Sequence, residues 1–118
     1  MFSMSDKEKF LGEFEQFILL SILKLSDNAY GSAIRQLLAE AVKRDVTIGA
    51  LYTTLDRLEK KGLLSSKMDE VTPERGGRAK KFYKLTAQGQ KALKRSKEAL
   101  TNMWQGLSLS MQHKVFSK

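Results

Sequence analysis

The apolar residues near the N-terminus recur at the spacing of a helix. Leu11, Phe14, Ile18, Ile22 and Leu25 follow one another at steps of three and four residues, which places them on one helical face. Three further apolar residues, Phe17, Leu20 and Leu23, widen this stripe. The pattern predicts a central helix that is covered on more than one side.

The next two apolar patterns predict two more short helices. The first begins near residue 28 or 30, ends near 42, and has as its apolar face Tyr30, Ile34, Leu37, Leu38 and Ala41. The second covers 47–61, with Thr47 as the N-cap. Its inward stripe is Ile48, Leu51, Leu55 and Leu58. Gly62 follows where a left-handed residue often ends a helix. Three short helices in succession favour a helix-turn-helix.

After residue 62 the pattern changes to alternation, which is typical of strands. Two strands are predicted, at 63–68 and 79–85, and the segment between them contains Pro73, Gly76 and Gly77. Proline and paired glycines favour a turn. The two strands and their loop therefore predict a β-hairpin, the wing of a winged helix-turn-helix.

Thr86 is the expected N-cap of a last helix. Its apolar residues fall at steps of seven, four, three and four: Leu93, Leu100, Trp104, Leu107 and Met111. Because no other segment is left to cover this seam, it predicts an interface with a second copy of the chain. The fold class expected is mainly α with a small β-hairpin: a winged helix-turn-helix domain over 1–85, followed by a dimerisation helix over 86–118.

Charge narrows the choice of partner. The 118 residues carry a formal net charge of +8, and thirteen basic residues against four acidic ones lie between positions 57 and 97. Such an excess points to a polyanion, nucleic acid before an anionic membrane surface. Double-stranded DNA is the predicted partner.

The candidate DNA contacts lie on the third helix and on the wing. On the helix they are Thr47, Gly49, Tyr52, Thr53, Arg57 and Lys60, and on the wing Arg75, Arg78, Lys80 and Lys81. A helix fits the major groove, and glycines let backbone approach phosphates closely. Basic residues at a hairpin tip suit the negative potential of a narrow groove. Tyr52 has two interpretations, a contact to DNA or a seal at the edge of the core. The basic residues of the last helix, Lys91, Lys94, Arg95 and Lys97, are interpreted as a solvated surface.

Composition excludes several other classes of function. Cysteine is absent and His113 is the single histidine, which excludes disulfides, thiolate chemistry and multi-histidine metal sites. With no phosphate-binding glycine loop and no partnered carboxylate pair, no enzyme activity, cofactor or metal is expected. The most apolar stretch, 10–25, is too short and too charged to span a bilayer. The sequence predicts a soluble, cytoplasmic protein without a membrane partner.

Several motifs in order resemble the PadR family of bacterial transcriptional regulators. They are Leu11-Gly12-Glu13-Phe14-Glu15, Ala29-Tyr30-Gly31, Gly49-Ala50-Leu51-Tyr52, Leu55-x-x-Leu58-Glu59-x-x-Gly62-Leu63 and Gly76-Gly77-Arg78-Ala79-Lys80-Lys81-Phe82-Tyr83-x-Leu85-Thr86. The resemblance implies a winged helix-turn-helix, a homodimer joined through the C-terminal helix, and repression of nearby genes. It makes the helix with Tyr52 the DNA reader and residues 78–81 the wing. Many relatives carry proline where this chain has Ala79.

Trp104 has two interpretations. Some members of the family bind aromatic compounds near the dimer axis through a tryptophan of the last helix, which implies a small aromatic effector. The spacing of Trp104 from Leu100 and Leu107 also fits simple packing in the dimer seam.

Two functions of different classes follow. The first is a dimeric DNA-binding repressor that reads a pseudo-palindromic operator with the helix 47–61 and the wing 63–85. The alternative is a protein-interaction module that uses a winged-helix scaffold without specific DNA binding. Salt distinguishes them, because binding to phosphates weakens steeply as salt rises.

Overall fold

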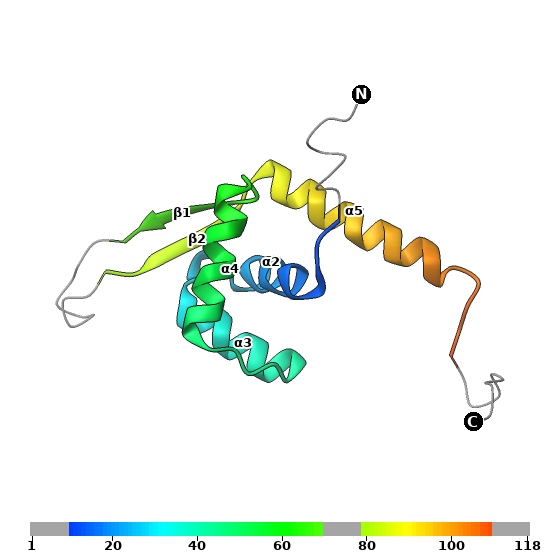
Figure 1. Ribbon diagram of the computed structural model, residues 1–118, viewed down its shortest axis with the longest axis horizontal. Coiled ribbons are helices and arrows are strands. Elements are labelled where there is room, and N and C mark those ends of the chain that lie inside the picture. Colours follow the sequence, from blue (N-terminus) through cyan, green and yellow to red (C-terminus); the bar gives the residue numbers. More distant parts are fainter. Residues whose placement is uncertain (1–9, 70–78, 110–118) are drawn as a thin grey trace.

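The computed structural model describes residues 10–69 and 79–109, whose elements follow the predicted order (Figure 1). They are α2 (Glu13–Leu25), the short 3₁₀ turn η1 (Ser26–Asn28), α3 (Gly31–Val42), α4 (Ile48–Lys60), the strands β1 (Leu64–Met68) and β2 (Lys81–Leu85), and α5 (Ala87–Trp104). In Figure 1 the hairpin and α5 extend in opposite directions from the body formed by α2, α3 and α4. The winged helix-turn-helix and its C-terminal helix are confirmed.

Local signals define the ends of the helices. At the start of α4 the Ala50 N–H donates to Thr47 Oγ1 at 3.1 Å, so the predicted N-cap is confirmed. At its end Gly62 has a φ of +82°, and the Leu63 N–H donates to the Leu58 carbonyl at 3.0 Å. This is the left-handed ending that glycine adopts without a steric penalty.

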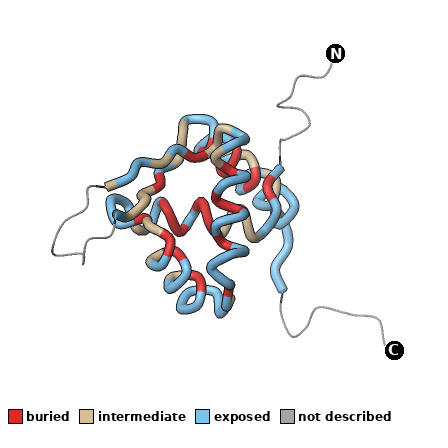
Figure 2. Tube along the Cα trace, turned by 60° about the vertical axis from the view of Figure 1, so that its left-hand side comes forward, coloured by how far each residue is buried: buried red, intermediate tan, exposed pale blue. Residues whose placement is uncertain are grey.

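The core lies where the helices meet, and Figure 2 shows the buried residues gathered there. Its fully buried side chains come from α2, α3, α4 and β2: Ile18, Leu19, Ile34, Leu38, Leu51, Leu55, Leu58 and Tyr83. Ala92 and Leu93 add the first half of α5. The inward faces of all four helices and one face of the hairpin thus share a single core.

Two expectations about coverage were wrong. α2 contacts α3, α4, β2 and α5 and is covered on more than one side, as expected, but Leu20 and Leu23 are exposed, because α5 contacts α2 without reaching over these two residues. Ile48, expected on the buried stripe, is 45 % exposed, whereas Thr54 is buried. The Thr54 hydroxyl donates to the Ala50 carbonyl at 3.1 Å, which satisfies its polar group inside the core.

The hairpin is antiparallel, with Leu64 opposite Leu85 and Ser66 opposite Tyr83. Its second strand also pairs on its outer edge with the segment before α3, where the Tyr83 N–H donates to the Ala29 carbonyl at 2.9 Å. The rings of Tyr30 and Phe82 meet there edge to face, with centroids 5.5 Å apart. Because a two-stranded hairpin alone is marginally stable, this pairing helps to hold the wing on the helical body.

The start of α5 is joined tightly to the end of α4. Thr86 Oγ1 donates to the Gly62 carbonyl at 2.6 Å and accepts from the Gly89 N–H at 3.0 Å. The Thr86 N–H donates to the Leu63 carbonyl at 3.1 Å. A Cβ at Gly89 would lie 2.1 Å from the Leu63 carbonyl oxygen, so this contact requires a glycine.

The predicted seam of α5 needs two corrections. Leu93 is 9 % exposed and belongs to the core, because the first half of α5 packs on α2. The helix ends at Trp104, and Gly106 has a φ of +81°, so Leu107 lies beyond the helix rather than on it. Met111 falls outside the described residues. The exposed apolar surface of α5 is therefore its second half, with Leu100 and Trp104.

Candidate nucleic-acid interface

The outward face of α4 is made of small and polar residues. Gly49, Thr53 and Lys60 are exposed, as predicted for this face. A Cβ built at Gly49 would meet nothing within 4 Å among the described residues, so no contact with them requires a glycine there. A glycine at an exposed helix start leaves room for an external group to approach the backbone.

Thr47 and Arg57 are both engaged within the subunit. The hydroxyl of Thr47 caps α4, which leaves its exposed surface for an external contact. Arg57 lies on the flank that faces α2, where its Nε is 3.9 Å from Glu15 Oε2. The ammonium of Lys61 is 3.4 Å from the same carboxylate oxygen. Glu15 therefore draws Arg57 toward α2, although half of the Arg57 side chain remains exposed.

Tyr52 lies on the other flank of α4 and reaches the start of α3. A Cβ built at Gly31 would lie 2.1 Å from the Tyr52 hydroxyl oxygen. Gly31 thus makes room for the phenol, while part of the Tyr52 side chain is exposed. Tyr52 therefore seals the edge of the core against the start of α3, while its contact to DNA stays a prediction.

The lysines at the base of the wing point to two different neighbours. The Lys80 ammonium lies 3.9 Å from the centroid of the Tyr30 ring, a cation–π contact with the segment before α3. The Lys81 ammonium lies 3.8 Å from Glu59 Oε1 on α4. The other two predicted wing contacts, Arg75 and Arg78, lie outside the described residues.

Tyr83 fills the space between β2 and α4 and is 1 % exposed. Its hydroxyl has no hydrogen-bond partner among the described residues. Burial raises the pKa of Tyr83 to about 12, with smaller contributions from Tyr52, Asp56 and Glu59. The residue is thus held by packing, and its phenol stays neutral at physiological pH.

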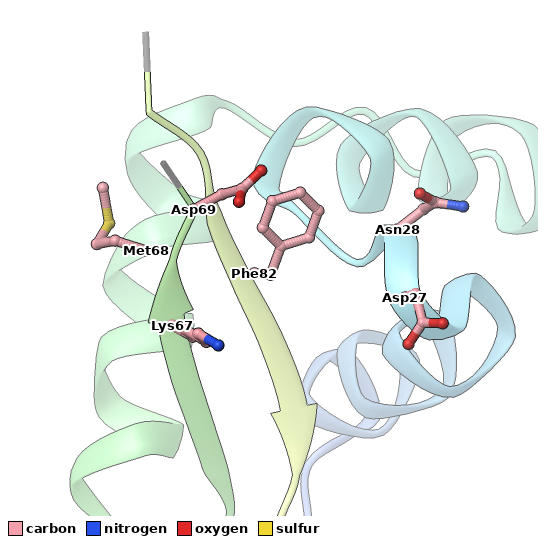
Figure 3. A pocket seen from close by; sticks show the side chains of 6 residues that line it. All are labelled: Asp27, Asn28, Lys67, Met68, Asp69 and Phe82. Atoms are coloured by element: carbon pink, nitrogen blue, oxygen red, sulfur yellow. The ribbon is translucent and has the colours of Figure 1, made fainter. Parts of the chain in front are cut away.

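The face of the hairpin opposite to Tyr83 borders a shallow cleft of about 330 Å³ (Figure 3). Asp27 and Asn28 line it from η1, and Lys67, Asp69 and Phe82 line it from the hairpin. Figure 3 shows the Asp69 and Phe82 side chains between the strands and η1. The Lys84 ammonium lies 3.9 Å from Asp27 Oδ1, and both side chains are highly exposed. This edge of the wing therefore carries both positive and negative charge.

The family model described as "Transcriptional regulator PadR-like family" matches residues 19–95, which include α3, α4, the hairpin and the first half of α5. The chain belongs to this family. The PadR-like protein is therefore a DNA-binding transcriptional regulator. Among curated proteins, none matches it.

Solved structures of PadR-like proteins are similar to this chain. A PadR-like transcription factor from Bacteroides fragilis has 33 % identity and a TM-score of 0.65, with 85 % of this chain and 89 % of that chain covered. A PadR family regulator from Clostridium difficile has 26 % identity and a TM-score of 0.59, covering 76 % and 90 %. One from Eggerthella lenta has 27 % identity and a TM-score of 0.62, covering 80 % and 81 %.

An apolar groove of about 1060 Å³ runs between α2 and α5 of this PadR-like chain. Its apolar lining consists of Leu20, Leu23, Leu93, Leu100 and Trp104, and its polar lining of Gln16, Gln90, Lys94, Lys97 and Thr101. The sequence predicted the α5 side of this surface. It missed the α2 side, because Leu20 and Leu23 were assigned to the core.

Sequence reasoning also missed the acidic residues that organise the basic face. Glu15 contacts Arg57 and Lys61, and Glu59 contacts Lys81. Their spacing in the sequence carries no signal for these contacts, since the partners are 22 or more positions away. Among the residues that the structure covers, no helix is both long and apolar enough to cross a membrane.

Proposed function

We propose that this PadR-like regulator is a cytoplasmic, homodimeric repressor that reads a pseudo-palindromic operator. In this proposal α4 enters the major groove, the wing contacts the neighbouring backbone or minor groove, and the α2–α5 groove joins the two subunits. The contacts to DNA would come from the ten residues predicted above on α4 and on the wing.

The outward face of α4 carries this proposal. Gly49 has open space around it, and Thr53 and Lys60 project from the same exposed face. The helix begins with N–H groups that favour an anion, and its last turn carries Arg57 and Lys60. None of the described residues covers Gly49 on this face, and a helix about 10–12 Å in diameter fits the major groove, which is ~12 Å wide.

The groove supports the homodimer. Leu20, Leu23, Leu100 and Trp104 are large apolar residues that are exposed together, and monomeric soluble proteins rarely leave such a surface uncovered. A two-fold axis beside α5 would let each copy place its α5 against the exposed part of the other's α2. The two α4 helices would then face half-sites about one helical turn apart, ~34–36 Å.

Binding to DNA is tested by selecting duplex fragments on the purified protein and titrating salt. We expect a pseudo-palindromic consensus and an affinity that falls steeply with salt, in proportion to the phosphates neutralised. A reporter promoter carrying the consensus should then be silenced by the protein, and activation would contradict repression. Salt-independent binding, or no sequence enrichment, would favour the protein-interaction module.

A small aromatic effector is a further part of the proposal, and Trp104 provides its test. Trp104 is the single tryptophan of the chain and lines the groove, so its fluorescence reports on this surface alone. We expect flat aromatic compounds to quench or shift the emission as they bind. Unchanged emission over a series of such compounds would remove the effector and leave Trp104 as a packing residue.

A further inference from the structure

The wing needs an anchor on α4 if helix and hairpin are to meet one duplex in a fixed arrangement. A two-stranded hairpin does not hold its own position firmly. Pairing with Ala29 fixes the outer edge of β2 to the segment before α3, but that contact does not orient the hairpin against α4.

A single carboxylate on α4 contacts both strands. Ser66 Oγ of β1 donates a hydrogen bond to Glu59 Oε2 at 2.7 Å. The Lys81 ammonium of β2 lies 3.8 Å from Glu59 Oε1. Ser66 and Lys81 are on the same face of the hairpin, because Ser66 is paired with Tyr83, two residues from Lys81. Glu59 thus joins α4 to each strand through a different oxygen.

The packing beside this contact does not supply a polar link. Tyr83 is buried next to Glu59, but its hydroxyl bonds to nothing among the described residues. The Lys81 ammonium lies 5.8 Å from the centroid of the Tyr83 ring, farther than its 3.8 Å from Glu59 Oε1. Apolar packing is not directional, and the hydrogen bond and the ion pair of Glu59 add directional contacts between α4 and the hairpin to it.

Charge supplies a second argument. Glu59 lies in the basic part of the chain, on the helix assigned to DNA, where a carboxylate opposes the binding of phosphates. We propose that Glu59 is a positioning residue: it clamps both strands of the wing to α4, so that helix and wing meet the duplex as one rigid unit. The consequence for DNA reading rests on the proposed function, whereas the clamp itself does not.

The clamp is tested on the free protein by amide hydrogen exchange of β1 and β2. Ser66→Ala removes the hydrogen bond without changing charge, and Glu59→Gln removes the attraction for Lys81. Ser66→Ala should accelerate exchange in the hairpin about three- to tenfold, the effect of one net hydrogen bond. Glu59→Gln should accelerate it about two- to fivefold, the effect of a partly exposed ion pair, and both variants should leave α2 and α3 unchanged. Unchanged exchange in both variants would overturn the clamp.

The role of Glu59 in sequence-specific DNA binding is tested by the ratio of the affinities for the selected operator and for a random duplex. Asp56→Asn is the matched control, because it removes a charge from the same helix, and Asp56 makes no hydrogen bond or ion pair to the described part of the hairpin. It should raise both affinities by the same factor. Ser66→Ala and Glu59→Gln should lower the ratio about three- to tenfold, and Glu59→Gln should also strengthen binding to the random duplex.

The two sets of measurements separate the possible failures. Faster exchange with an unchanged ratio would show that Glu59 holds the wing but does not serve sequence reading, which overturns the positioning role. If the wild-type protein bound the selected operator and the random duplex equally well, the proposed function and the positioning role would be overturned together. The exchange rates would still decide whether the clamp exists.

Discussion

Replacing Trp104 tests the homodimer most directly, because its cost can be worked out from the subunit. Trp104 is 47 % exposed at the end of α5. Of a side chain of about 250 Å², roughly 120 Å² is thus left for a second copy to cover. At ~25 cal/mol per Å² this area contributes about 3 kcal/mol from each subunit. A symmetric dimer buries the residue twice, so Trp104→Ala removes at most about 6 kcal/mol.

In dissociation constants this is a large effect. Each ~1.4 kcal/mol changes the constant tenfold, so loss of even half of the upper limit weakens the dimer about 100-fold. Sedimentation velocity over a dilution series measures this shift. The subunit itself should keep its fold, since Trp104 is outside the core, and far-ultraviolet circular dichroism checks that the helical content is unchanged.

The adjacent Met103 provides the control. It is more exposed than Trp104 but does not line the groove, so Met103→Ala should weaken association far less. A dissociation constant that Trp104→Ala leaves unchanged would refute the groove as the dimer interface. An equal loss in both variants would place the interface at the end of α5 as a whole.

Four further predictions concern the core, the α4–α5 joint, the outward face of α4 and the wing. Tyr83→Phe removes a buried hydroxyl without a partner and should leave stability in urea unchanged or raise it by about 1 kcal/mol. Because the pKa of Tyr83 is raised to about 12, the unfolded chain releases its proton first. The free energy of unfolding of the wild type should therefore decrease between about pH 10 and 12. In Tyr83→Phe this contribution to the decrease should be absent. Gly89→Ala drives a methyl group into the Leu63 carbonyl and should cost about 1–3 kcal/mol in thermal unfolding, whereas Gly49→Ala should keep stability but bind the operator more weakly. Arg78→Ala should lower operator affinity in gel shifts by about 1–3 kcal/mol if the side chain contacts a base, and unaltered affinity would remove this residue from the mechanism.

The sequence predicted most of the fold because the ends of its helices and strands depend on local chemistry. Thr47 caps α4 with its own hydroxyl, and Gly62 ends that region with a left-handed φ. Both effects act within a few residues, so a single chain displays them. The alternation of β1 and β2 likewise follows from the two-residue period of strands. These signals do not depend on which other element lies nearby.

The errors lie where tertiary neighbours decide. Periodicity identified the apolar side of α2, but whether Leu20 and Leu23 are covered depends on where α5 lies, which no local pattern encodes. Ile48 follows the same period as Leu51 and is exposed, so periodicity alone did not decide its burial. The partners of Glu59 depend on the register of the hairpin, and a shift of one residue would send Ser66 to the other face.

In the proposed dimer, the joint between α4 and α5 would make the dimer geometry and the spacing of the DNA half-sites depend on each other. Thr86 binds the carbonyls of Gly62 and Leu63, and Gly89 closes the same contact, so α5 cannot turn freely about the end of α4. A helix of 18 residues is about 27 Å long, so a tilt of about 10° at one end moves the other by about 5 Å. That displacement exceeds the ~3.4 Å between successive base pairs. Substitutions in the groove that preserve the dimer but alter its packing should therefore change the preferred separation of half-sites, and not only the strength of association.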